Sequence, residues 1–130
     1  MNIADNRIGN EGFSRISKAL TPKSPLVVLN LSNNDLDGVN TVDAIKEYLR
    51  HGRNLLELNL SQNRVCDQGL IKLSGIFEEN SCVLTRLIVS QAKITILGAA
   101  QLFDSLKHNS HLKELIISDN DLSGLNICKL

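Results

Sequence analysis

Apolar residues follow two spacings along this chain, and the two spacings occur in a regular order. In LLELNLSQN, residues 55–63, Leu56, Leu58 and Leu60 alternate with polar residues, which is typical of a short strand with one buried face. In VCDQGLIKLSGIFEEN, residues 65–80, apolar residues recur three and four positions apart, which indicates a helix with one apolar face. The pattern therefore predicts a unit made of a strand, a turn and a helix.

The helical spacing recurs in four segments, and we expect the apolar residues that follow it to be buried. These residues are Phe13, Ile16, Ala19 and Leu20; Val42, Ile45 and Leu49; Leu70, Leu73, Ile76 and Phe77; and Ala99, Leu102, Phe103 and Leu106. A glycine lies six positions after a recurring asparagine site in three units, at Gly12, Gly69 and Gly98. There we expect close packing or unusual dihedral angles, which a residue without Cβ tolerates.

The strand segment is repeated. Copies begin at residues 1, 29, 58, 87 and 115 and read MNIADNRI, LNLSNNDL, LNLSQNRV, LIVSQAKI and LIISDNDL, so that successive copies are 28 or 29 residues apart. Leu26, Leu55, Leu84 and Leu112 precede the last four copies by three positions, which gives LxxLxLxxNxL. Such regular spacing predicts stacked units that bury their apolar faces against one another.

An asparagine recurs at one site after the strand, at Asn6, Asn34, Asn63 and Asn120. A carboxamide can both donate and accept hydrogen bonds, so stacked copies can satisfy backbone groups of buried turns. We therefore expect a structural ladder of asparagines inside the stack. The fourth copy has Ala92 at this site, which predicts a turn group without its partner and a cost of about 1–3 kcal/mol unless water replaces the amide.

The pattern LxxLxLxxNxL with 28- to 29-residue units resembles the ribonuclease inhibitor-like class of leucine-rich repeats. That class also includes the Ran GTPase-activating protein and the repeat domains of intracellular nucleotide-sensing receptors. The resemblance implies an α/β fold: a right-handed solenoid, or horseshoe segment, with a parallel sheet on its concave side and helices on its convex side. It implies one domain over residues 1–130 with about 4.5 repeats. It says little about function, because one scaffold carries unrelated binding surfaces.

Variable strand positions should form columns across the concave face. One column contains Glu57, Arg86 and Glu114, whose alternating charges attract one another between neighbouring strands. These charges either form a self-satisfied surface ladder or contact a partner protein, and both alternatives stay open. The next column changes from amides to aliphatic residues and consists of Asn2, Asn30, Asn59, Ile88 and Ile116. Ile88 and Ile116 are candidate anchors for a protein partner.

Catalytic and metal-binding residues are not indicated. Ser32, Ser61, Ser90 and Ser118 form a further column, but repeated serines are typical of a scaffold, and no His or acid is placed beside any one of them. The three histidines, His51, His108 and His111, lie in or just after predicted helix ends without a third metal ligand, so we expect helix termination and exposure. We predict no enzyme activity, no cofactor and no metal.

Composition limits the partners and the compartment. Lys plus Arg and Asp plus Glu both number 14, so the formal net charge is zero and neither nucleic acid nor an anionic membrane is an expected partner. No apolar run is long enough to span a bilayer, and the first residues lack the pattern of a signal peptide. Cys66, Cys82 and Cys128 have no disulfide or zinc spacing, which favours reduced thiols and a cytoplasmic location.

The two ends of the repeat array lack the polar caps that solenoids normally have. Met1 falls directly on the first strand, and GLNICKL, residues 124–130, begins a sixth helical pattern with Ile127 and Leu130 at core positions. We therefore expect either a fragment of a longer array or ends that another copy or a partner covers. Self-association through an end is an expectation, since uncovered edges invite pairing.

The sequence thus favours a non-catalytic module that binds a partner protein through its concave strand face, with Ile88 and Ile116 as anchors and the charged column setting register. Two alternatives stay open. The first is a regulator of a small GTPase, as in the Ran GTPase-activating protein, although none of that protein's functional residues can be matched here. The second is a sensor or targeting segment of a larger receptor or effector.

Overall fold

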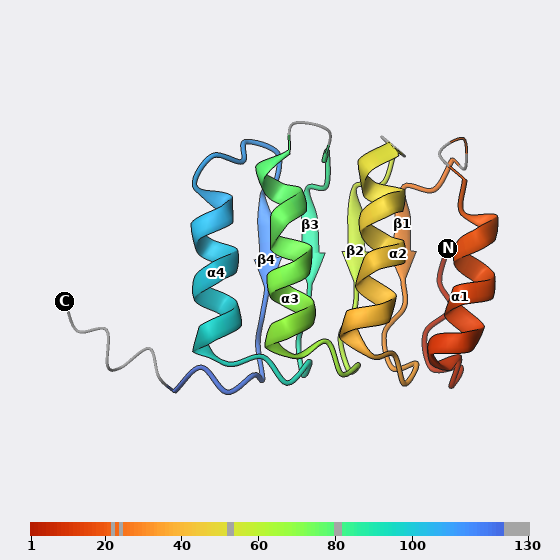
Figure 1. The fold of residues 1–130 in the computed structure, drawn as a ribbon, viewed down its shortest axis with the longest axis horizontal. Helices are drawn as coiled ribbons and strands as arrows, with labels where there is room; N and C mark the ends of the chain where they lie inside the picture. Colours follow the sequence, from red (N-terminus) through yellow and green to blue (C-terminus); the bar gives the residue numbers. More distant parts are fainter. Residues whose placement is uncertain (22, 24, 52–53, 80–81, 124–130) are drawn as a thin grey trace.

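Strands and helices alternate along the chain in a computed structural model that describes residues 1–21, 23, 25–51, 54–79 and 82–123 (Figure 1). The order is α1 (Gly9–Ala19), β1 (Val28–Asn30), α2 (Gly38–His51), β2 (Glu57–Asn59), α3 (Cys66–Ser74), the 3-10 helix η1 (Gly75–Glu78), β3 (Arg86–Ile88), α4 (Ile96–Leu106) and β4 (Glu114–Ile116). The predicted sixth helical pattern, with Ile127, Cys128 and Leu130, lies outside the described residues.

The four strands form one parallel sheet in the order of the sequence, and the helices form a second layer along one side of it (Figure 1). Neighbouring strands are about 4.8 Å apart, whereas packed helices need about 8–10 Å. A stack of such units therefore bends with the sheet on its inner side. This arrangement confirms the predicted α/β solenoid, with the strands lining the concave face.

The register of the sheet matches the sequence repeat. Leu29, Leu58, Leu87 and Leu115 are paired from strand to strand, so the aligned copies lie side by side. The first copy joins them through a bridge between Asn2 and Asn30. All five copies thus stack with the offset that the 28- to 29-residue spacing predicts.

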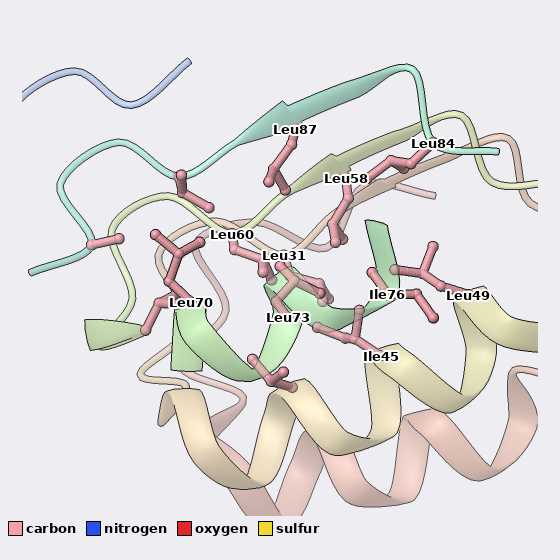
Figure 2. Close-up of a cluster of buried hydrophobic side chains, with 14 of the residues drawn as sticks. Leu31, Ile45, Leu49, Leu58, Leu60, Leu70, Leu73, Ile76, Leu84 and Leu87 are labelled. Atoms are coloured by element: carbon pink, nitrogen blue, oxygen red, sulfur yellow. The ribbon is translucent and has the colours of Figure 1, made fainter. Parts of the chain in front are cut away.

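The hydrophobic core lies between the sheet and the helix layer (Figure 2). Leu58 and Leu60 point into it from the β2 unit, as the period-two pattern predicts, and Leu70 and Leu73 meet them from α3. These four side chains have almost no exposed surface. Full burial of a leucine stabilises a fold by roughly 1.5–3 kcal/mol, so these four side chains are a main source of the unit's stability.

Three residues predicted to be buried are exposed. Leu56 is 39% exposed because it lies one position before β2, and Leu55 takes the core position instead. Phe103 is 45% exposed. It lies about 140–160° around α4 from Gly98 and Ser105, which contact the preceding unit, since each helical residue turns by about 100°. Ala19, the last residue of α1, is also exposed.

The asparagine ladder ties successive turns together. The Oδ1 atom of Asn34 accepts hydrogen bonds from the backbone N–H groups of Asn6 at 2.9 Å and Ile8 at 3.4 Å. Its Nδ2 group donates to carbonyls of its own turn and to Ile3 O in the preceding copy. Asn63 binds the turn of Asn34 in the same way. Asn120 repeats this pattern with the turn of the fourth copy. The ladder amides therefore hydrogen-bond within and between units.

The ladder is broken at Ala92, as the sequence predicts. By analogy with the other rungs, an amide at this position would accept from the backbone N–H groups of Asn63 and Val65. Neither of these N–H groups has an acceptor within the described part of the chain, although both residues are buried. Ala92 has no exposed surface, so this break lies inside the core.

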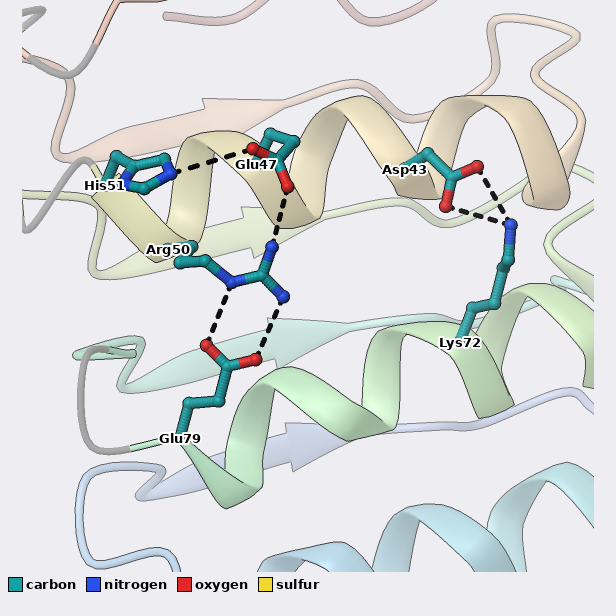
Figure 3. Close-up of polar contacts among 6 residues, drawn as sticks. All are labelled: Asp43, Glu47, Arg50, His51, Lys72 and Glu79. Carbon is teal, nitrogen blue, oxygen red and sulfur yellow. Dashed lines mark hydrogen bonds and ion pairs between the residues drawn. The ribbon is translucent and has the colours of Figure 1, made fainter.

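Polar side chains also link neighbouring helices on the convex side (Figure 3). Arg50 on α2 donates to both carboxylate oxygens of Glu79, from Nε at 3.1 Å and from Nη2 at 2.9 Å, and its Nη1 donates to Glu47 at 2.6 Å. These bonds, Glu79 foremost, raise the pKa of Arg50. Lys72 on α3 reaches both oxygens of Asp43 at 2.9 Å. Both inter-helix links join α2 to the segment of α3 and η1 without using the strand face.

The start of α4 is bound by the preceding helix. Asp67 Oδ1 accepts from the N–H groups of Thr95 at 2.8 Å and Gly98 at 3.1 Å, and Asp67 Oδ2 accepts from the Thr95 hydroxyl. A Cβ atom on Gly98 would lie 2.5 Å from Asp67 Oδ1. This contact requires glycine at position 98, which confirms the predicted close packing. Among the described helices, we find none long and apolar enough to traverse a bilayer.

Candidate protein-binding surface

The strand face carries the side-chain columns that the repeat predicts. Glu57 pairs in register with Arg86, and Arg86 with Glu114, while Asn59 pairs with Ile88, and Ile88 with Ile116. The sheet therefore brings the six predicted partner-binding residues together in two neighbouring columns. Contact of these residues with a partner stays a prediction.

The charged column forms its own ion pairs. Arg86 donates from Nη1 to Glu57 at 2.8 Å and from Nε to Glu114 at 2.7 Å. The hydrogen bond to Glu114 is the main reason that the pKa of Arg86 is raised. Of the two alternatives left open by the sequence, this geometry favours the self-satisfied ladder. Because two carboxylates flank one guanidinium, the column keeps a formal charge of −1.

The amide half of the middle column is oriented by local backbone bonds. The Oδ1 atoms of Asn2, Asn30 and Asn59 each accept from the N–H group two residues later, at 3.0, 3.0 and 2.9 Å. Their Nδ2 groups donate no hydrogen bond to any residue that the structure describes. Three carboxamide donors therefore remain available on neighbouring strands. Ile88 and Ile116 continue this column as half-buried side chains.

The serine column is part of the scaffold. Ser61 Oγ accepts from the Ser90 N–H group at 3.0 Å, and the hydroxyls of Ser90 and Ser118 are 2.9 Å apart. Ser61 is nearly fully buried. No histidine is hydrogen-bonded to any of these serines in the described residues, so the column lacks the base that a serine nucleophile needs.

Exposed apolar residues lie together at the start of β1 and β2. The sequence predicts Val28 at the head of the charged column, where it pairs with Glu57, but does not predict the exposure of Val27 and Leu56 beside it. Val27, Val28 and Leu56 are all exposed, and the Leu56 N–H group donates to Val27 O at 2.8 Å, so the two segments are neighbours. The signal was present in the repeat pattern, because Leu55 occupies the conserved-spacing leucine site and Leu56 is therefore the next, outward position. This group adds apolar area beside the charged column.

No metal-binding cluster is formed by the described residues. They contain no group of three or more His, Cys, Asp or Glu side chains that could hold a metal ion. Of the predicted terminal histidines, His51 is exposed with Nε2 3.7 Å from Glu47, and His108 and His111 are exposed as expected. Cys66 is half-buried, and Cys82 is buried with its thiol pKa raised mainly by desolvation. Both are free thiols.

Comparison with known sequences agrees with this geometry. The family pattern described as Leucine Rich repeat matches residues 51–74 and 108–125, which include strand-and-turn segments of the third and fifth copies. The chain therefore contains leucine-rich repeats. The chain is also similar to ribonuclease inhibitors, whose repeats give the ribonuclease inhibitor-like class its name.

Several relatives of this leucine-rich-repeat chain are much longer proteins. It is 32% identical over 128 residues to NACHT, LRR and PYD domains-containing protein 4C of Mus musculus, a match that covers 98% of this chain and 13% of that protein. The ribonuclease inhibitor of Sus scrofa is 26% identical over 131 residues, which covers all of this chain and 28% of the inhibitor. The chain thus spans less than a third of these relatives.

A solved structure shares the fold of the leucine-rich-repeat chain. The structure named Leiomodin-1 Actin-Binding Site 2 superposes with a TM-score of 0.69 at 21% sequence identity, over 85% of this chain and 61% of that one. At this identity the likeness concerns the fold alone. These matches indicate no enzyme family.

Proposed function

We propose that this chain is a non-catalytic protein-interaction domain that binds a partner protein through its concave strand face. The observation that carries the proposal is the division of polar groups in the structure. Ladder amides and helix-side ion pairs hold the units together, whereas the Nδ2 donors of Asn30 and Asn59 and the side chains of Ile88 and Ile116 remain open on the strand face.

The relatives support an interaction role at a coarse level. Leucine-rich repeats of this class are protein-binding modules, and one relative is named for inhibiting a ribonuclease. For this chain, the proposed anchors are Ile88 and Ile116, with Asn59 beside them and Glu57, Arg86 and Glu114 along the flank. An aliphatic anchor that loses its exposed surface in an interface contributes far more than a rim charge.

Two further expectations belong to this proposal. We propose a cytoplasmic location, which the free thiols of the described cysteines Cys66 and Cys82 would suit. We also propose that copies of the chain associate through an end of the repeat array, which light scattering over a range of concentrations would test. A second copy would then compete with the partner only if it covered the strand face.

The test is affinity capture with two matched variants, followed by mass spectrometry and a binding titration with the captured protein. Replacing Ile88 and Ile116 with threonine keeps β-branched residues in the strands but removes apolar area, so we expect at least tenfold weaker binding. Phe103→Thr changes an exposed apolar residue on the convex side and should leave binding unchanged. Equal binding by both variants and the natural chain would refute a concave-face site.

A further inference from the structure

The middle column of the strand face sets a spacing that a partner must match. Asn2, Asn30, Asn59, Ile88 and Ile116 are consecutive neighbours across the sheet. At about 4.8 Å per strand, the column is about 19 Å long. Its side chains are uncommitted at their outer ends, with three open amide donors followed by two half-buried isoleucines.

Resting on the proposed function, we infer that the partner segment is an amphipathic α-helix that lies along this column, across the strands. A helix presents one side chain per turn on the same face, about every 5.4 Å, so its residues drift from the column by about 2–3 Å over five strands. An extended peptide repeats each face about every 6.7 Å and drifts by about 7–8 Å, which is more than one whole strand. Side-chain flexibility absorbs the first mismatch but not the second.

The width of the face fits a single helix. Each strand has three residues, from Val28–Asn30 in β1 to Glu114–Ile116 in β4. Three residues extend for about 10 Å, which matches the 10–12 Å diameter of one helix with its side chains. The charged column would then lie along one flank of the bound helix and the serine column along the other.

The chemistry of the column changes along its length and therefore orders the partner's side chains. Asn30 and Asn59 present mainly donors, because their Nδ2 groups are open whereas each Oδ1 atom already accepts one hydrogen bond from the chain itself. Acceptor side chains should face them, and aliphatic side chains should face Ile88 and Ile116. Glu57 lies two residues before Asn59 on the same face, and the column of Glu57, Arg86 and Glu114 is net negative. Glutamine and asparagine therefore suit this site better than carboxylates, which Glu57 would repel.

Capped alanine- and lysine-based helical peptides test the inference directly. Three peptides carry glutamine (Q) and leucine (L) on five successive turns of one face in the orders QQQLL, LLQQQ and QLQLQ, so that composition, charge and length are constant. The first two orders represent the two directions in which a helix can lie. A fourth peptide has the sequence of whichever of QQQLL and LLQQQ binds more tightly, with a proline at its centre, and therefore cannot form a continuous helix.

Titration of the 130-residue chain, labelled with nitrogen-15, gives the readout. We expect one of the two peptides QQQLL and LLQQQ to shift the side-chain NH2 signals of Asn30 and Asn59. The signals of the buried side-chain amides of Asn34 and Asn63 should stay unchanged and serve as internal controls. Its Kd should be at least tenfold lower than that of QLQLQ and of the proline peptide. I88T/I116T, which retains the amides, should weaken this binding about tenfold.

Several outcomes would overturn the inference: equal Kd values for the ordered, mixed and proline peptides, shifts outside the column, or no binding of any peptide at about 1 mM. These results separate the inference from the proposed function. If the peptides fail while the captured partner still depends on Ile88 and Ile116, the helical partner is wrong and the concave-face site stands. If the captured partner is indifferent to these two residues, the proposed function itself is wrong.

Discussion

Restoring the missing rung of the asparagine ladder should stabilise the protein. In Ala92→Asn, the new Oδ1 atom would accept from the N–H groups of Asn63 and Val65, which lack acceptors in the described structure. The equivalent rung at Asn63 accepts two such bonds, both at 3.0 Å. The new Nδ2 group would donate to carbonyls of its own turn and of the preceding one, as Asn120 does.

The size of the effect follows from the two N–H groups. Leaving a buried polar group without a partner costs about 1–3 kcal/mol. Ordering an asparagine side chain and fitting it into a site now filled by Ala92, which has no exposed surface, offsets part of the gain by on the order of 1 kcal/mol. For two such groups, we therefore expect the free energy of unfolding to rise by about 1–5 kcal/mol, measured by urea denaturation with the slope m unchanged.

Two control variants separate the hydrogen bonds from simple filling of space. Ala92→Leu introduces a side chain of similar shape that cannot accept, and it should destabilise the fold or leave it unchanged. Asn34→Ala removes an existing rung and should cost about 1–3 kcal/mol, because it leaves the part-buried N–H groups of Asn6 and Ile8 without their acceptor. If Ala92→Asn gave no gain, or if Ala92→Leu gave the same gain, the unpaired N–H groups would not be the cause.

Three further predictions concern the packing at Gly98, the reactivity of the two described thiols and the pKa of Asp104. Gly98→Ala should lower the free energy of unfolding by about 1–3 kcal/mol in urea denaturation, because the new Cβ meets the carboxylate that binds the start of α4, and a gain would refute this close contact. The Cys82 thiol, buried and with a raised pKa, should react with a thiol reagent only after unfolding, whereas half-buried Cys66 should react in the native protein, as peptide mass spectrometry would show. The Asp104 carboxyl has a pKa below its usual range, chiefly because Lys107 donates a hydrogen bond to it. The stabilising effect of this pair is therefore present above the unfolded pKa and is lost as the pH falls through the folded pKa. In Lys107→Ala, NMR titration should give a higher pKa for Asp104.

The sequence predicts the strand register correctly because each unit repeats the same buried positions. Leu58 and Leu60 must face the core, and a slip of one residue would expose both. The errors at Leu56 and Phe103 have a different origin. Both residues adjoin true core positions, and periodicity within one unit does not reveal which flank of a helix meets its neighbour.

The candidate site was predicted in its columns but not in its details. Strand spacing places Arg86 between Glu57 and Glu114, but only side-chain conformations show that one guanidinium binds both carboxylates. The orientation of Asn30 and Asn59 has a sequence signal that was not used. Each asparagine is followed two residues later by a serine, and the asparagine Oδ1 atom accepts a hydrogen bond from the N–H group of that serine. This Asx turn fixes the carboxamide with its Nδ2 donors pointing outward.

The positions of the stabilising contacts explain how the strand face can serve recognition at little cost to the fold. Ladder bonds at Asn34 and Asn63 lie in buried turns, and the ion pairs of Arg50 and Lys72 lie between helices. None of these contacts involves the middle column, so changes there remove little of what holds adjacent units together. I88T/I116T should therefore lower stability far less than Asn34→Ala while having the larger effect on binding. A comparable loss of stability in both variants would mean that the middle column helps to hold the units together. The strand face would then not be a recognition surface separate from the scaffold.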